Sequence, residues 1–125
     1  MQITQTAVSL NVPDVAASAS FAKQHLGFTE QMSDEGFVSL GHPEIGMNLI
    51  FLAVGLPTFK PAEAAGPAGG LLLVFVVDDL DASFARIEAA GARVVTPPET
   101  EPWGERFCQF ADPNGIVWQL VQWVS

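Results

Sequence analysis

The side chains that could do chemistry are few and lie far apart along the chain. His25 and His42 each stand alone, and the single cysteine, Cys108, has no histidine close to it in the sequence that could activate it. The acidic residues in 78–81 lie where a helix is expected to begin, so helix capping explains them better than a calcium site does. We therefore expect both histidines on the surface, and the thiol buried in a structural role.

Composition excludes several classes of protein. One cysteine can form neither an intramolecular disulfide nor a cysteine-based zinc site, and no glycine-rich loop has the spacing of a nucleotide-binding motif. A net charge of −9, from 14 acidic and 5 basic residues, would repel a nucleic acid. The longest apolar run, 71–77, is too short for a membrane span, and no signal peptide is indicated. We expect a cytoplasmic protein without nucleic-acid or membrane partners.

The stretch 107–120 contains Gln119, the residue of greatest functional interest. Two apolar runs flank Asp112-Pro113-Asn114-Gly115, which favours a tight turn, so we predict a hairpin. Side chains of its second strand alternate between two faces. One face is predicted to hold Val117, Gln119, Val121 and Trp123, and the other to hold Trp118, Leu120 and Gln122. Trp118 is expected in the core beneath a helix.

The elements that would position Gln119 occur twice in the chain. The first set has strands predicted at 4–12, 28–32, 37–40 and 47–54, with a helix between Asp14 and Gly27. The second set has strands at 71–77 and 93–96, a helix capped by Asp79 or Asp81 and ended by Gly91, a loop from Pro97-Pro98, and then the hairpin. Asp14 and Asp79 are 65 residues apart, and Gly27 and Gly91 are 64 apart. An internal repeat of this kind predicts a duplicated β-α-β-β-β architecture.

The repeat divides the chain into two modules. Module one is expected at 1–54 and module two at 71–125. Between them, 55–70 contains Pro57, Pro61 and Pro67 among several glycines. This composition is typical of a linker or lid.

Short motifs along nearly the whole chain resemble the vicinal oxygen chelate superfamily, which includes glyoxalase I, extradiol dioxygenases, fosfomycin resistance enzymes and bleomycin resistance proteins. The matching motifs are Val12-Pro13-Asp14-Val15, Ser18-x-x-Phe21, Leu26-Gly27-Phe28, Asp79-Leu80, Ala89-Ala90-Gly91-Ala92, Trp103-Gly104-Glu105-Arg106 and Asp112-Pro113-Asn114-Gly115. Ala22 departs from the family pattern, in which Tyr often follows Phe21. The resemblance implies an α+β fold in which two βαβββ modules form curved mixed sheets, or half-barrels, around a ligand cleft. It also implies a homodimer.

The resemblance also implies four positions that hold a divalent metal in the enzymes of the family. They fall on Ala7, Ile50, Leu72 and Gln119. Only Gln119 offers a lone pair, a neutral amide oxygen, and Gln5 could add a second amide if the register differs by one pleat. We expect no metal site and no cofactor.

The strand face that holds Gln119 is predicted to form an apolar trough with a few neutral polar groups. This composition is typical of a pocket for an organic ligand. Trp103 could stack on a planar or cationic ligand, and Arg106 could pair with a ligand carboxylate, or with Glu105 or Glu99. Phe59 could close over the cleft from the linker, whereas Trp123 also suits a dimer interface. The predicted ligand-binding residues are Ser9, Asn48, Ile50, Phe59, Trp103, Arg106, Gln119 and Val121.

Three functions are compatible with this sequence. The first is a metal-independent binding protein for a small organic molecule, such as an aromatic or cationic drug, similar to the bleomycin and mitomycin resistance branch. The second is a superfamily enzyme, a lyase, isomerase or dioxygenase, with a non-standard or metal-free site. It would need a general base that the sequence does not identify. The third is a dimeric accessory domain without a small ligand.

Overall fold

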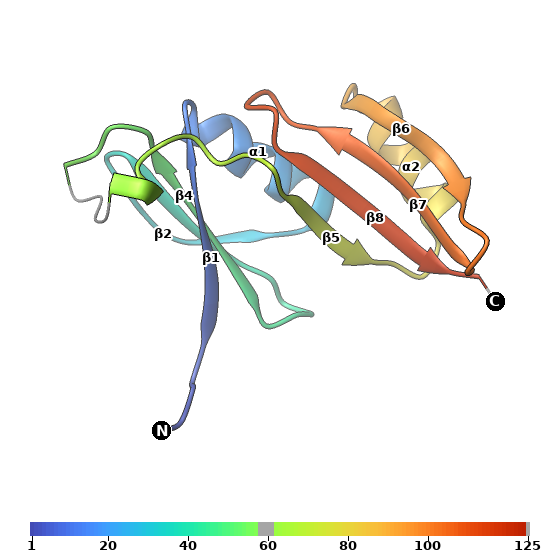
Figure 1. Cartoon of the computed structure of the whole chain (residues 1–125), viewed down its shortest axis with the longest axis horizontal. Helices are drawn as coiled ribbons and strands as arrows, with labels where there is room; N and C mark the ends of the chain where they lie inside the picture. Colours follow the sequence, from blue (N-terminus) through green and yellow to red (C-terminus); the bar gives the residue numbers. More distant parts are fainter. Residues whose placement is uncertain (58–61, 125) are drawn as a thin grey trace. The chain divides into compact units, whose positions relative to one another are not determined.

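The computed structural model describes residues 1–57 and 62–124 and contains two compact units, Met1–Gly69 and Gly70–Ser125. Each unit has the order strand, helix and three strands, and builds one open four-stranded mixed sheet (Figure 1). The α+β class and the duplicated βαβββ order predicted from the sequence are confirmed. No helix within the described residues is long and apolar enough to cross a membrane.

The first unit forms a sheet in the order β1-β4-β3-β2, in which β1 and β4 are parallel and the other pairs are antiparallel. Its elements are β1 (Thr6–Val12), α1 (Val15–Leu26), β2 (Thr29–Asp34), β3 (Phe37–Gly41) and β4 (Met47–Ala53). Asp14 caps α1 by accepting a hydrogen bond from the Ala17 amide at 3.2 Å. Gly27 ends the helix with φ of 74°, a left-handed conformation that glycine adopts without strain.

Both histidines belong to the packing of this unit, which corrects the expectation of two surface histidines. His25 is buried on the inner face of α1, with its ring 4.6 Å from that of Phe21. His42 is half-buried, and its ring lies 5.0 Å from Phe28. Its Nδ1 accepts from the Glu44 amide at 3.1 Å, so Nε2 carries the proton and donates to the Leu26 carbonyl at 2.7 Å. His42 therefore satisfies a carbonyl at the end of α1.

Part of the predicted linker is attached to the first unit. It contains a short 3₁₀ helix, η1 (Ala62–Ala64). The Asn11 side chain donates to the carbonyls of Ala64 and Gly66, and the Ala68 amide donates to the Asn11 carbonyl at 2.8 Å. Asn11 is consequently buried although it is polar.

The second unit forms a sheet in the order β5-β8-β7-β6, again with one parallel pair, β5 and β8. Its elements are β5 (Leu72–Val76), α2 (Leu80–Ala89), β6 (Arg93–Thr100), β7 (Glu105–Ala111) and β8 (Val117–Trp123). The loop predicted from Pro97-Pro98 is wrong, because β6 continues through both prolines. β6 is an edge strand, and its register shifts between Thr96 and Glu99, so neither proline needs an amide proton for pairing.

The predicted hairpin between β7 and β8 is confirmed. The Gly115 amide donates to the Asp112 carbonyl at 2.9 Å, and Gly115 takes φ of 82°. Trp118 lies in the core, as predicted, and its indole N–H donates to the Asp112 carboxylate at 3.1 Å. Asp79 is the residue that caps α2, where it accepts from the Ala82 amide at 3.1 Å.

Candidate functional site

The β5-β8-β7-β6 sheet has a helix face and an opposite face, which we call the open face. Gln122 on β8 accepts from the first amide of α2, at Leu80, and the Phe110 ring on β7 packs against Phe84 of α2. The alternate residues therefore point away from the helix, as the alternation predicted. By register the open face carries Leu72, Val74, Val76, Arg93, Thr96, Glu99, Glu105, Phe107, Gln109, Ala111, Val117, Gln119, Val121 and Trp123.

A row of uncharged polar groups crosses the open face. The Thr96 hydroxyl donates to Oε1 of Gln109 at 2.7 Å, and Nε2 of Gln109 donates to Oε1 of Gln119 at 2.7 Å. These three residues, which we call the amide row, come from three adjacent strands. Thr96 and Gln109 were not singled out from the sequence. The register of the hairpin would have revealed Gln109, because it lies directly opposite Gln119.

This donor set does not fit a divalent metal. Three of the four family positions carry the side chains of Ala7, Ile50 and Leu72, which have no lone pair. The oxygen of the fourth, Gln119, already accepts a hydrogen bond from Gln109. Within residues 1–57 and 62–124 no group of three His, Cys, Asp or Glu side chains is placed to hold an ion.

Aliphatic side chains on β5 border the amide row. Val74 is the register partner of Gln119, and it is 46% exposed, with Leu72 and Val76 exposed on either side of it. Val121, two residues after Gln119, is buried at the base of the same face. An exposed aliphatic edge beside a buried amide is suited to an organic ligand.

Two tryptophans and a carboxylate lie together at the end of β8. Trp123 is the register partner of Glu105, and the Trp103 indole N–H donates to the Glu105 carboxylate at 3.2 Å. The tryptophans are 66% exposed at Trp103 and 60% exposed at Trp123. Exposed indole rings beside a carboxylate suit a planar or cationic group.

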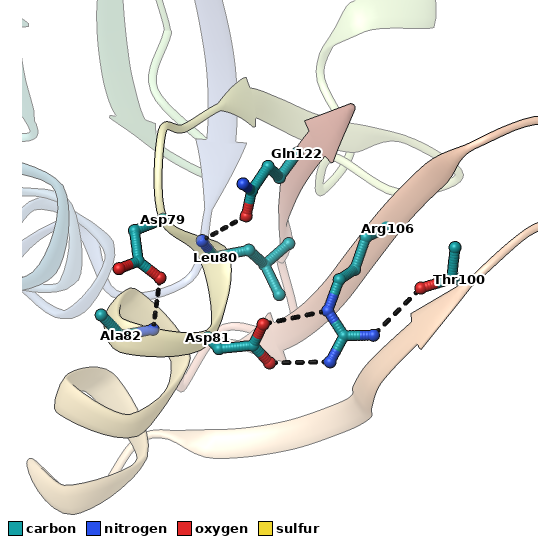
Figure 2. A network of polar contacts seen from close by, with 7 residues as sticks. All are labelled: Asp79, Leu80, Asp81, Ala82, Thr100, Arg106 and Gln122. Carbon is teal, nitrogen blue, oxygen red and sulfur yellow. Dashed lines mark hydrogen bonds and ion pairs between the residues drawn. The ribbon is translucent and has the colours of Figure 1, made fainter. Parts of the chain in front are cut away.

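Arg106 lies on the helix face instead of the open face. Its guanidinium donates to both oxygens of Asp81 in α2, at 3.1 and 2.7 Å, and to the Thr100 hydroxyl at 3.0 Å (Figure 2). These partners differ from Glu105 and Glu99, the acids considered from the sequence. The hydrogen bonds from Arg106 lower the pKa of the Asp81 carboxyl, and the same pairing raises the pKa of the guanidinium. Arg106 therefore ties α2 to β7 and β6.

Cys108 is buried on the same helix face, as predicted for a structural thiol. Burial raises its pKa to about 11, only partly offset by a backbone hydrogen bond from Leu120. A thiol that stays protonated at neutral pH is a weak nucleophile.

The first unit places the remaining predicted residues on the face of its own sheet that is turned away from α1. Ala7 pairs with Asn48, and Ser9 pairs with Ile50. Ser9 is exposed, and Asn48 and Ile50 are half-buried. Gln31, which the sequence did not single out, lies over Gly41 beside Asn48, where a side chain at position 41 would collide with it. Phe59 lies outside the described residues.

A family model described as the Glyoxalase/Bleomycin resistance protein/Dioxygenase superfamily matches residues 2–120. The chain belongs to this superfamily. An uncharacterized protein from Mycobacterium tuberculosis is 50% identical over 46 residues, but that match spans only 37% of this chain and 27% of the relative.

Several solved structures with this fold are similar to the chain, among them a binding protein and an enzyme. TnmS3, an antibiotic binding protein from Streptomyces sp. CB03234, is 28% identical with a TM-score of 0.75, over 100% of this chain and 99% of its own. Lactoylglutathione lyase from Agrobacterium tumefaciens has the same TM-score at 18% identity, over 95% of this chain and 92% of its own. TioX from Micromonospora sp. ML1 has a TM-score of 0.79 at 23% identity, over 97% and 99%. The last two likenesses show the fold alone.

Proposed function

We propose that this protein binds a small, planar organic molecule, such as an antibiotic, without a metal ion and without changing it chemically. The observation that carries this proposal is the composition of the open face. Neutral amides occupy its centre, exposed aliphatic side chains border them, and two exposed tryptophans stand at one end. The fourth family position, Gln119, has its oxygen engaged by Gln109.

The similarity to TnmS3 over the whole chain supports a binding function. We also propose that the protein acts as a homodimer in the cytoplasm, as the family resemblance and the cysteine content predict. Ser9, Asn48 and Ile50, which lie on the sheet of the first unit, remain predicted ligand-binding residues of that unit.

The test is a binding screen with planar aromatic antibiotics, both neutral and cationic. Melting temperature is measured with and without prior dialysis against EDTA, and hits are titrated by calorimetry. A ligand at 100 times its dissociation constant adds about 2.7 kcal/mol to the free energy of unfolding. We expect at least one saturable ligand whose affinity is unchanged by EDTA.

Matched variants locate the site. Trp103→Leu and Trp123→Leu should each weaken a hit several-fold, because each removes a ring from the exposed end of the open face. Phe84→Leu removes a ring from the helix face and should lower the melting temperature without weakening the ligand. Mass spectrometry of the recovered hit should show the unmodified compound. A chemically changed compound, or binding that requires added metal, would favour a superfamily enzyme, and no hit at all would refute binding.

A further inference from the structure

The amide row has a direction, and that direction restricts what a ligand can present to it. Each internal hydrogen bond runs the same way, from the Thr96 hydroxyl to the Gln109 oxygen and from the Gln109 nitrogen to the Gln119 oxygen. The last group in the row is the Nε2 amide of Gln119. Among the residues described in the structure, none accepts a hydrogen bond from this nitrogen.

The Nε2 amide of Gln119 lies in a largely buried side chain, where a missing hydrogen-bond partner costs free energy. Gln119 is only 8% exposed, so little of the side chain is hydrated. A ligand lying on Val74 and its exposed neighbours on β5 would lie beside Gln119, the register partner of Val74, and would exclude water from its amide. A donor left unpaired in this way costs free energy, whereas an acceptor on the ligand recovers it.

We propose that Gln119 selects ligands carrying a hydrogen-bond acceptor, such as a ring carbonyl, within a flat apolar framework, and rejects ligands that present an N–H or a cation at that point. This inference rests on the proposed function and specifies the chemistry of the same site. In the structure, Gln109 occupies the oxygen of Gln119 and Thr96 donates to Gln109, so the Gln119 nitrogen is the group that this row offers to a ligand.

Three tricyclic compounds of nearly equal shape test the selection. Fluorenone carries a carbonyl acceptor, fluorene carries a methylene, and carbazole carries an N–H donor. Dissociation constants are measured by equilibrium dialysis of the full chain against each compound. One neutral hydrogen bond gives about a tenfold preference for fluorenone over each of the other two, equivalent to about 1.4 kcal/mol.

Variants of Gln119 distinguish selection of a hydrogen-bond acceptor from general affinity for flat apolar compounds. Gln119→Met keeps the length of the side chain and removes the donor, so fluorenone and fluorene should then bind about equally. Gln119→Glu leaves an acceptor in place of the donor, so carbazole should become the preferred compound. Gln122→Met makes the same change on the opposite face of β8, where Gln122 accepts from Leu80, and should leave the wild-type ratio unaltered. Circular dichroism confirms that each variant is folded.

Three results would overturn the selection by Gln119. They are a fluorenone preference that persists in Gln119→Met, a wild-type preference for carbazole, and failure of all three tricycles to bind. If one of these occurs while the antibiotic screen yields a metal-independent ligand, the proposed function stands and the inference about Gln119 fails. If the screen is also negative, both fail.

Discussion

Asp112 offers a sharp test of how the strand that carries Gln119 is held in place. The carboxylate is buried, and its Oδ1 accepts from the amides of Asn114 at 2.9 Å and Ile116 at 3.1 Å. Its Oδ2 accepts from the buried indole N–H of Trp118 at 3.1 Å. Replacing Asp112 with Asn preserves the shape and one acceptor oxygen, but turns an NH₂ group toward the indole N–H.

The loss of stability expected for Asp112→Asn follows from the NH₂ group that it turns toward the indole N–H of Trp118. Two donors then face one another, and the buried indole N–H of Trp118 loses the carboxylate oxygen to which it donates, which costs about 1–3 kcal/mol. We expect Asp112→Asn to lower the free energy of unfolding by about 2 kcal/mol. Flipping the amide does not rescue it, because the NH₂ would then face the amides of Asn114 and Ile116.

Urea unfolding followed by circular dichroism measures the effect. A slope of about 1–3 kcal/mol per molar urea turns 2 kcal/mol into a midpoint shift of roughly 1 M. Asp78→Asn, an exposed acid one residue before the cap of α2, controls for the change in net charge and should stay within about 0.5 kcal/mol of wild type.

The decisive comparison is a double-mutant cycle with Trp118→Phe, which removes the indole N–H. In that background Asp112→Asn should cost less than about 1 kcal/mol, because no buried donor is left unsatisfied. An Asp112→Asn cost below 0.5 kcal/mol in the wild-type background, or equal costs in both backgrounds, would refute the role assigned to this hydrogen bond.

Two further predictions concern the thiol and the linker. With a pKa near 11, Cys108 should not react with a thiol reagent at pH 8 until urea unfolds the chain, and rapid native labelling would contradict its burial. Because folding raises this pKa, the protonated Cys108 thiol contributes its full stabilisation below about pH 8.5 and loses it as the pH rises toward 11. The urea midpoint should therefore fall more steeply over that pH range in wild type than in Cys108→Ala. Asn11→Ala should speed cleavage by Glu-C protease after Glu63, because it removes both bonds to the Ala64 and Gly66 carbonyls, whereas an unchanged rate would show that Asn11 does not anchor η1.

Local signals in the sequence predicted the elements well because each rests on a few neighbouring residues. Asp14, Gly27 and Asp79 act as caps and stops within one turn of their helices, and Gly115 meets the backbone demand of a hairpin. The period-two alternation of β8 also needs no tertiary information, so the opposite placement of Trp118 and Gln119 could be predicted.

Features that depend on the neighbouring strand or helix could not be predicted in the same way. Pro97 signals a loop, but the edge position of β6 makes its missing N–H harmless. His25 was expected at the surface near the C-terminal end of its helix, yet the face of α1 on which it falls packs inward. Arg106 lies opposite Gln122 in the register, so its helix-facing direction follows only when the β7–β8 pairing is known.

The distribution of charge links the acidic composition to the open face. Asp81 is neutralised on the helix face by Arg106, and the middle of the open face holds the uncharged amide row. Glu105 on β7 brings a carboxylate to that face beside its register partner Trp123, which lies four residues after Gln119 on β8, or about 13 Å along the strand. A ligand that satisfies both ends therefore carries a neutral acceptor over Gln119 and its positive charge about 13 Å away. Under the proposed function, the reverse order would place the cation against the Gln119 amide donor, so we expect a cationic ligand to bind in one orientation.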